Sequence, residues 1–587
     1  MLVNFMLKGK ITLLKTGIYF TFVLMCRKSH FLMKHRTILY LLALLVSLIN
    51  SPNAAAQAHP DKPALVVGIV VDGLRNDWIE RYWNLFGEGG IKKIVRQGTG
   101  YTDASVPFLL ADIGSSHASI STGTPPALHG IVAETWYNRL RKEETWCTRD
   151  YLAKTIGSSD ASRTPANGNG RHSARQLLAS TIGDRIILAS DYKSKVISIS
   201  IRPEAAVLLC GHIPGSAYWF DNTFGSWITS SEYANSIPSW VAGFNLRNSS
   251  EHYLSREWDL LLAGNLYTGC PPDDNDLETG YYNQFKTFPY KLARIRKESL
   301  SQDFEVLSLV PYGNTLTTDF AITAIHEESL GKDAYPDLLW VSYTAIDEVT
   351  RRFGPDSREV ADALLRLDMD IQRLIYQVEE SVGKEKALFI LTSTHGAAMD
   401  PDYSAALNLP GGFFRYRNAM ALLNSYLSAV HGDGKWVESY LNLQLYLNET
   451  LIEQKKISFS AIQDEAARFL THFEGIARAI PADRLLSGEI TSPWDGMVQN
   501  SFNPDRTGDL LLILQPGWIE EKNSDSDSRS PYPYDTKIPL YWYGWTIPKQ
   551  TISRPVTLLD IAPTIAHIMT ITPPDAATGR NLSDLFK

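Results

Sequence analysis

Carboxylate and imidazole side chains follow three of the most apolar segments of the chain. Asp72 ends the run ALVVGIVV, Asp347 comes shortly after DLLWVS, and His395 comes shortly after ALFILT. Aspartate and histidine are the side chains that hold zinc ions in two-metal hydrolytic sites. Taken singly, each residue has a simpler explanation, because Asp commonly caps a helix and a buried His commonly packs in a core.

The apolar segments predict the elements that must position these side chains. A nearly unbroken apolar run is typical of a strand that is buried on both faces of a parallel sheet. Five such runs are predicted as strands, over residues 64–71, 337–342, 387–392, 509–514 and 538–543. A helix is predicted between the second and third of them, with Asp356 and Glu359 at capping-box spacing and an apolar residue at every third or fourth position.

Strands that alternate with helices predict an α/β fold. We expect a doubly wound, mostly parallel central sheet with helices on both faces. In such sheets ligands bind at the carboxyl ends of the strands. Asp72, Asp347, His395 and Lys537 are therefore expected to gather near one edge of the sheet.

Length and composition limit the expected domain organisation and the classes of binding partner. A chain of 587 residues predicts a large domain with sizeable insertions, and the Gly-, Pro-, Trp- and Tyr-rich region at about 141–335 is expected to be an insertion capping the sheet edge. A net charge of -8 and a pI near 5.9 exclude a protein that binds the nucleic-acid backbone. No nucleic-acid partner is expected.

Residues 33–58 have the parts of a secretory signal peptide in order. A basic start, an apolar run and the small-residue site AQA precede His59. We predict a mature domain over residues 59–587, exported to the periplasm or cell envelope. Residues 1–32 are interpreted as an over-extended gene start, and a membrane is an expected partner only in the alternative that residues 11–26 form an anchor.

The mature chain contains three cysteines, Cys147, Cys210 and Cys270. An odd number leaves at least one thiol unpaired. One disulfide among the three remains open, and no C-x-x-C spacing indicates a zinc knuckle or a redox site.

Five ordered segments resemble PafA-type alkaline phosphatases, which are members of the alkaline phosphatase superfamily related to nucleotide pyrophosphatase/phosphodiesterases. They are VVDGLR, HASISTGT, RFGP, LTSTHGAA and YDTKIPL, at residues 70–75, 117–124, 352–355, 391–398 and 534–540. The resemblance extends over essentially the whole mature chain. It implies an alkaline phosphatase-like fold with two zinc ions that clamp the attacking and leaving oxygens of a phosphoryl transfer.

The resemblance also implies six positions for metal ligands. Three keep the residue of the family, namely Asp72, Asp347 and His395. The other three are changed, namely Arg351 and Lys537 in place of His, and Thr394 in place of Asp. Occupancy by zinc is therefore in doubt.

The positions that act on the phosphoryl group are changed as well. The nucleophilic Thr of the family falls on Ile113, and Ser115 and Ser116 are only weak substitutes, most simply explained as helix-capping residues. At the positions that hold the phosphoryl oxygens, Glu134 replaces Asn, and Arg202 with Glu204 replaces a Lys-x-Arg pair. A carboxylate at position 134 should repel a phosphate dianion.

Arg351 and Lys537 are predicted to neutralise the negative charge of nearby carboxylates. A cation placed where a divalent ion sat neutralises the carboxylates left behind, which would be costly to bury unpaired. We expect Asp347, Arg351 and Lys537 to lie within a few ångströms of one another. An ion pair is expected, chiefly between Asp347 and Lys537.

Three functions follow from these residues. The leading hypothesis is an exported pseudophosphatase that binds an unknown ligand or partner at a degenerate two-metal site. No cofactor is expected to fill that site at full occupancy. The first alternative is an active phosphomonoesterase or phosphodiesterase that uses zinc in a non-standard site. The second is a scaffold that binds an envelope protein through its Trp/Tyr-rich cap.

Overall fold

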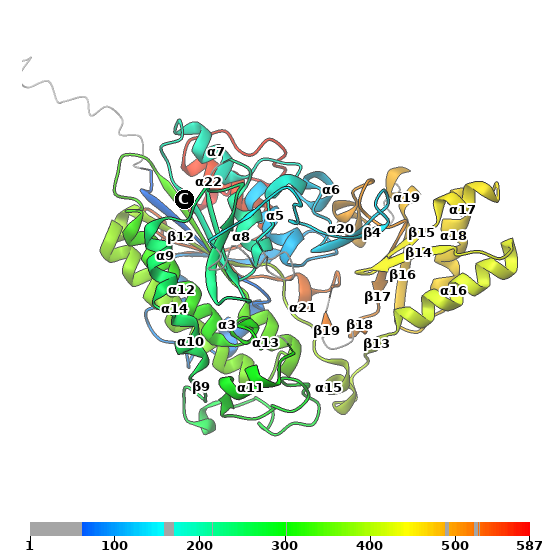
Figure 1. Ribbon diagram of the computed structural model, residues 1–587, viewed down its shortest axis with the longest axis horizontal. Coiled ribbons are helices and arrows are strands. Elements are labelled where there is room, and N and C mark those ends of the chain that lie inside the picture. Colours follow the sequence, from blue (N-terminus) through cyan, green and yellow to red (C-terminus); the bar gives the residue numbers. More distant parts are fainter. Residues whose placement is uncertain are drawn as a thin grey trace, which may run out of the picture. The chain divides into compact units, whose positions relative to one another are not determined.

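A mixed sheet of ten strands forms the centre of the fold (Figure 1). In spatial order its strands are β21 (Gln550–Thr557), β2 (Thr99–Ser105), β20 (Leu540–Gly544), β12 (Ala387–Ser393), β1 (Leu65–Val71), β11 (Asp337–Tyr343), β6 (Val196–Ser200), β7 (Ser216–Asp221), β8 (Ser226–Ser230) and β5 (Thr155–Ile156). β1 pairs in parallel with β11 and β12, whereas β20 runs antiparallel to β12 and β8 antiparallel to β7. The predicted α/β class is confirmed.

The computed structural model describes residues 62–157, 170–213, 215–300, 302–487, 492–521, 526–527 and 529–586. The predictions of an N-terminal extension and a signal peptide lie outside the described residues, as does the possible anchor. Within the described part of the chain, no helix combines the length and apolarity needed to cross a membrane.

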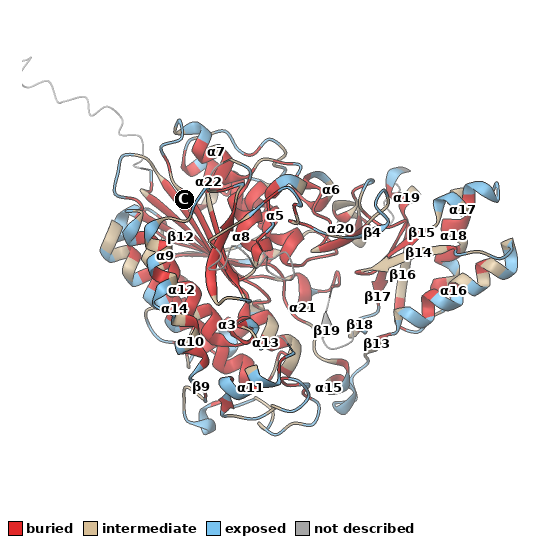
Figure 2. Cartoon of the chain, viewed as in Figure 1, coloured by how far each residue is buried: buried red, intermediate tan, exposed pale blue. Residues whose placement is uncertain are grey.

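The central strand β1 is buried on both sides because its successive side chains point to opposite faces. Ile69 packs into one hydrophobic core together with residues of α14 (Arg358–Val382), and Val70 packs into a second core together with residues of α22 (Ile561–Ile568). Figure 2 shows the strands of the sheet as the most continuously buried part of the chain. Helix layers on both faces hold the strand ends in fixed positions.

Helix α14 confirms the predicted apolar periodicity but begins differently. Its N-cap is Ser357, whose hydroxyl accepts a hydrogen bond from the backbone N–H of Val360 at 3.2 Å. Asp356, the predicted cap, instead forms an ion pair with Arg81. The capping-box spacing therefore located the start of the helix to within two residues.

The region at about 141–335 differs from the predicted capping insertion. Strands β5 to β8 lie within it and extend the main sheet. Three of its tryptophan side chains, Trp219, Trp227 and Trp258, are at most 1% exposed, and the ring of Trp227 stacks on Phe320 at 4.3 Å. These three tryptophans pack the core, whereas Trp146, Tyr151, Tyr192 and Tyr282 of the same region are exposed, so the scaffold alternative stays a hypothesis.

A separate four-stranded sheet forms the lobe at the right of Figure 1. Its order is β14 (Val437–Leu441), β15 (Gln444–Leu447), β17 (Leu510–Leu514) and β16 (Ile476–Pro481). α16 (Tyr416–His431) and α18 (Phe459–Leu470) pack against it around a core of their own. The apolar run at residues 509–514 is thus a strand, as predicted, but of this lobe and not of the main sheet.

The three cysteines of the described residues are all free. Cys147 and Cys210 are fully buried, and Cys270 is partly buried. The disulfide that the sequence left open is absent among them.

Candidate functional site

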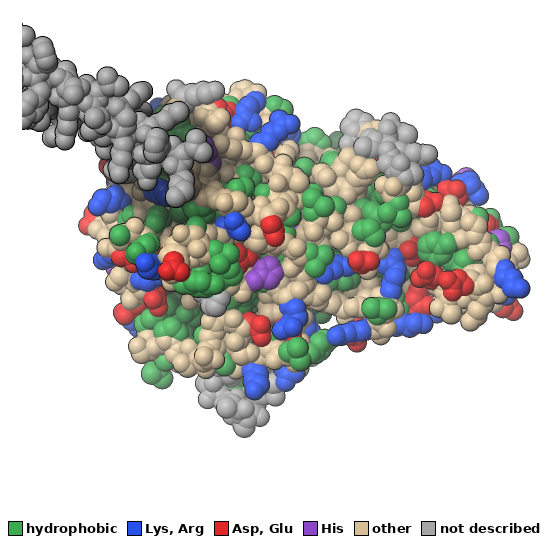
Figure 3. All heavy atoms as spheres, turned by 90° about the horizontal axis from the view of Figure 1, so that it is seen from above, with side chains coloured by type: hydrophobic (Ala, Val, Ile, Leu, Met, Phe, Trp, Pro, Cys, Tyr) green, Lys and Arg blue, Asp and Glu red, His purple; other side chains and the backbone are tan. Residues whose placement is uncertain are grey.

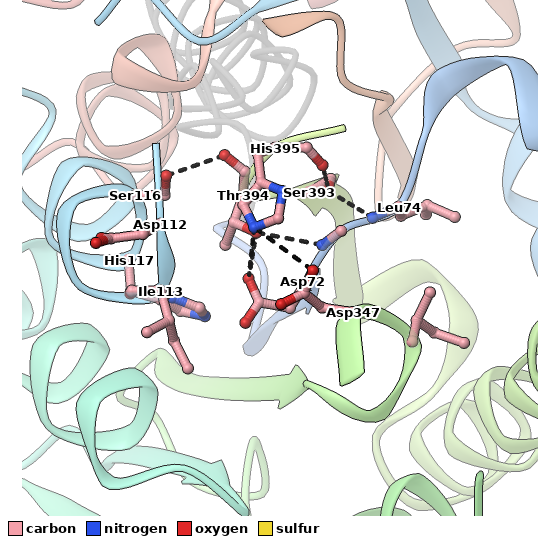
Figure 4. A network of polar contacts seen from close by, with 12 residues as sticks. Asp72, Leu74, Asp112, Ile113, Ser116, His117, Asp347, Ser393, Thr394 and His395 are labelled. Carbon is pink, nitrogen blue, oxygen red and sulfur yellow. Dashed lines mark hydrogen bonds and ion pairs between the residues drawn. The ribbon is translucent and has the colours of Figure 1, made fainter. Parts of the chain in front are cut away.

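Asp72, Asp347 and His395 lie together at the carboxyl ends of neighbouring strands (Figure 4). Asp72 follows β1, His395 comes two residues after the end of β12, and Asp347 lies in the first turn of α13 (Ala345–Phe353), directly after β11. Nε2 of His395 lies 4.0 Å from Oδ1 of Asp72 and 4.0 Å from Oδ1 of Asp347. The predicted gathering of these residues is confirmed.

Gly73 permits the close approach of its own backbone to Asp347. Its φ of +70° lies in the left-handed region, and a Cβ built on it would stand 3.0 Å from Oδ1 of Asp347. A larger residue would therefore be strained by its backbone and would also crowd the Asp347 carboxylate.

The electrostatics of this group follow from its burial. Burial and the neighbouring Asp347 carboxylate raise the pKa of Asp72 to about 7. Burial on its own would lower the pKa of His395, but the carboxylates of Asp347 and Asp72 outweigh it, and the pKa is raised. The Nδ1–H of His395 donates to the carbonyl of Gly396 at 2.6 Å, which fixes the ring.

Thr394 and Arg351 contact the carboxylates of Asp72 and Asp347 respectively. The hydroxyl of Thr394 donates a short hydrogen bond to Oδ1 of Asp72. The guanidinium of Arg351 lies against Oδ2 of Asp347, with Nε at 2.8 Å and Nη2 at 2.7 Å. The predicted proximity of Arg351 to Asp347 is therefore confirmed, as an ion pair.

Lys537 does not pair as predicted. Lys537 forms its ion pair with Asp103 near the end of β2, and both side chains are about two-fifths exposed, at 42% and 38%. The expected Asp347–Lys537 pair is wrong. The backbone of residue 537 bridges to Ser105, beside Asp103, which directs the lysine to that carboxylate.

The hydroxyls of Ser115 and Ser116 are engaged inside the protein. Both residues are fully buried in α5 (Ile113–Thr122). Ser115 donates to the carbonyl of Leu110 at 2.6 Å, and Ser116 donates to the carbonyl of Thr394 at 2.9 Å. This geometry opposes a nucleophilic role for either serine and supports the structural explanation.

Asp112 is a site residue that the sequence reasoning missed. It caps the N-terminus of α5, and its carboxylate accepts the N–H of Ser115 at 2.8 Å and the N–H of Glu134 at 2.6 Å. The guanidinium of Arg529 lies 3.7 Å away. A helix N-terminus attracts anions, and here the protein's own carboxylate occupies it. The sequence signal was available, since Asp112 directly precedes Ile113.

Arg202 is the centre of a second ion-pair group. It pairs closely with Glu134 and lies 3.3 Å from Glu204 and 3.5 Å from Glu348. Burial raises the pKa of Glu134, although the charge of Arg202 opposes this. Three of these four residues were predicted to lie at the site, and Glu348, next to Asp347 in the chain, was missed.

Comparison with known proteins identifies the family of this chain. Residues 66–537 match the model of type I phosphodiesterase / nucleotide pyrophosphatase. The chain belongs to this family. It is 32% identical to alkaline phosphatase PafA of Elizabethkingia meningoseptica over 532 residues, which cover 89% of this chain and 95% of that protein.

Two further comparisons agree with this assignment. Alkaline phosphatase PhoV of Synechococcus elongatus is 29% identical over 559 residues, covering 93% of this chain and 98% of that protein. The crystal structure of wild-type PafA superimposes with a TM-score of 0.85 at 31% identity, covering 90% of this chain and 99% of that one. The predicted membership of the alkaline phosphatase superfamily, with PafA-type resemblance, is confirmed.

Proposed function

We propose that this family member is a pseudophosphatase, which keeps the phosphatase fold but binds a ligand without hydrolysing a phosphate ester. One observation carries the proposal: the cations that could attract a phosphate are already paired with carboxylates of the same chain. Arg202 pairs with Glu134, and Arg351 pairs with Asp347. A phosphate dianion would have to displace these carboxylates or lie beside them.

The residues present do not fit the pair of zinc ions that the family implies. Arg351 and Lys537 are cations where neutral imidazoles would be needed, and Ile113 offers no oxygen to a metal. Within the described ranges, no group of three or more His, Cys, Asp and Glu side chains is arranged to hold a metal ion. Zinc-dependent activation of a nucleophile therefore has no support from these side chains.

The second candidate function is phosphate-ester hydrolysis, which was the first alternative from the sequence. The comparisons favour it over the pseudophosphatase hypothesis, since PafA and PhoV are both named alkaline phosphatases. The two candidates disagree only about what the changed side chains allow, so a direct measurement of turnover decides between them.

The deciding experiment compares the wild-type protein with an Asp72→Asn, His395→Ala variant. Hydrolysis of p-nitrophenyl phosphate and of bis(p-nitrophenyl) phosphate is measured with added zinc and with EDTA, and purified PafA is the positive control. We expect equal, near-background rates in wild type and variant, unaffected by zinc. Zinc-dependent turnover that the variant lacks would establish the hydrolase instead.

We also propose that the protein is exported to the periplasm or cell envelope through the signal-like segment at residues 33–58. The basic, apolar and small-residue parts of that segment support the proposal. N-terminal sequencing of the protein from fractionated cells should start at His59. A cytoplasmic protein with an intact N-terminus would contradict it.

A further inference from the structure

The segment at residues 271–290 forms one wall of a narrow pocket beside the candidate site. It runs between β9 (Glu257–Trp258) and α11 (Leu292–Glu298), in the lower part of Figure 1. Arg351, the partner of Asp347, also lines the pocket, so another wall belongs to the candidate site. We propose that residues 271–290 form a gate on this side of the site, which is closed at neutral pH and opens in alkaline solution. The proposal concerns access to the site and applies to either candidate function.

In its closed position the gate leaves little room for a ligand. Leu277 and Glu278 of the gate line the pocket together with Phe353 and Pro355. The pocket holds about 30 Å³, which is space for about two water molecules, whereas small-molecule sites typically measure about 300 to 1,000 Å³. A ligand therefore reaches Arg351 through this pocket only after the gate has moved.

Few buried side chains hold the gate in place. Its buried residues are Glu278, Gly280, Tyr281 and Tyr290. The backbone N–H groups of Thr279 and Gly280 donate to the carbonyl of Arg352, at 3.0 and 3.2 Å. The ring of Tyr281 packs edge-on against Phe353, with 5.2 Å between the ring centroids. A segment with so little buried surface opens locally at a lower free-energy cost than the core of the protein.

Two buried carboxyl groups lie where the gate contacts α14. Glu278 of the gate is 5% exposed, and Glu359 in the first turn of α14 is fully buried. Among the described residues, Oε2 of each group has no hydrogen-bond partner. Oε1 of Glu359 accepts a hydrogen bond from the hydroxyl of Tyr290, which also belongs to the gate, at 2.6 Å. Burying a charge without full hydrogen bonding is costly, so this contact suits protonated carboxyl groups.

The pKa shifts of both groups agree with this geometry. Burial, and after it the neighbouring Glu359, raises the pKa of Glu278 to about 9, and burial raises the pKa of Glu359 to about 8. In the open gate both groups face water, where their pKa values return to about 4.5. The free energy of opening therefore falls as the pH rises from 4.5 and is lowest above about pH 9.

The other charges around these two groups do not remove the cost of ionisation. Around Glu278 they are Asp273 and Lys286 of the gate, Arg351 and Arg352 of α13, Asp356 in the following turn, and Asp400 and Tyr403 at α15 (Pro401–Ala406). Asp273 raises the pKa of Glu278 and Lys286 lowers it, each by less than Glu359 does. Arg351, Arg352 and Asp356 already form ion pairs with residues outside the gate. Glu359 faces Asp273 and Asp362, which raise its pKa further.

Limited proteolysis of the full mature protein with trypsin tests the gate, because cleavage of a native protein follows the population of the locally open state. Lys286 supplies a cleavage site within the gate, and the exposed Lys455 supplies one outside it. Rates are measured at about pH 7 and about pH 9.5, and each is divided by the rate on a short peptide substrate at the same pH. We expect normalised cleavage after Lys286 to increase at least about tenfold at the higher pH, since one ionising group shifts the opening equilibrium by up to about tenfold per pH unit. Cleavage after Lys455 should not change.

Two variants connect the opening to the buried carboxyl groups. Glu278→Gln combined with Glu359→Gln keeps both side chains neutral at every pH and should remove the increase, whereas Glu298→Gln, at an exposed position, should keep it. If the double variant does not fold, Glu278→Gln alone serves in its place and should reduce the increase. Equal normalised cleavage of wild type at the two pH values, an unchanged increase in the glutamine variant, or loss of the native circular dichroism spectrum at the higher pH would each overturn the gate. Phosphate-ester turnover is a separate readout, so its result bears only on the proposed function.

Discussion

Arg351 holds the carboxylate of Asp347 from one turn further along the same helix, with Nε and Nη2 at 2.8 and 2.7 Å from Oδ2. The other carboxylate oxygen, Oδ1, lies 4.0 Å from Nε2 of His395. One carboxylate therefore stands between an arginine and an imidazole. The ion pair of Asp347 is made within its own helix, whereas Lys537, which lies far along the chain, pairs with Asp103.

Removing this arginine should destabilise the protein. Arg351→Ala leaves the Asp347 carboxylate, whose side chain is only 11% exposed, without its main cation. We expect a loss of about 1 to 3 kcal/mol in the free energy of unfolding, between the values for exposed and fully buried pairs, because Arg351 itself is 22% exposed. Urea denaturation measures the loss.

The same change in an Asp347→Asn background is the control for this prediction. If the loss comes from the unpaired carboxylate, Arg351→Ala should cost at least about 1 kcal/mol less there, which is a coupling energy in a double-mutant cycle. Additive losses would show that Arg351 acts through packing and not through its charge.

Zinc content should depend on the changed ligand positions. The wild-type protein is expected to retain well under one zinc ion per chain after dialysis, because its ligand set does not close a tetrahedral shell. A variant that combines Ile113→Thr, Arg351→His, Thr394→Asp and Lys537→His should bind more zinc than wild type. Elemental analysis of both proteins checks this, and about two zinc ions in the wild type would contradict it.

Lys537 should contribute little to stability. It pairs with Asp103 across a surface where both side chains are well exposed, at 42% and 38%. Lys537→Ala is expected to change the free energy of unfolding by at most about 1 kcal/mol. A double-mutant cycle should show no coupling with Asp347→Asn and only weak coupling with Asp103→Asn. Strong coupling with Asp347 would restore the pairing that the sequence predicted.

The retained residues could be placed from the sequence because parallel strands end at a common edge. Asp72, Asp347 and His395 each follow an apolar run that could only be a buried strand, and their convergence follows from the topology. Lys537 precedes a strand that runs antiparallel to β12, so the same argument does not fix its side chain. Its partner is decided by the local pairing with Ser105, which no apolar pattern encodes.

The ion pairs around the site were harder to predict for a different reason. Arg202 meets Glu134 and Glu348 only after folding, across 68 and 146 residues of chain respectively. Spacing along a sequence identifies pairs within a helix, such as Asp347 with Arg351, but not pairs between elements. The Trp-rich region at 141–335 illustrates the same limit, since composition alone did not distinguish buried core strands from an exposed cap.

The last prediction concerns pH and the buried carboxyl group of Glu278. This residue is 5% exposed, its Oε2 has no hydrogen-bond partner, and burial raises its pKa from 4.5 to about 9. Between pH 4.5 and about 9, this carboxyl group is therefore protonated in the folded state and ionised in the unfolded state. The free energy of unfolding falls as the pH rises through that window, because only the folded state still binds the proton. Glu278→Gln keeps a neutral side chain at every pH, so its melting temperature should fall less between pH 5 and pH 9 than that of wild type. Some slope should remain in the variant, because burial also raises the pKa of Glu359 to about 8. Glu298→Gln, at an exposed position, is the matched control and should behave like wild type. Differential scanning fluorimetry of the three proteins checks the prediction, and identical slopes for wild type and Glu278→Gln would show that this carboxyl group is not buried in its protonated form.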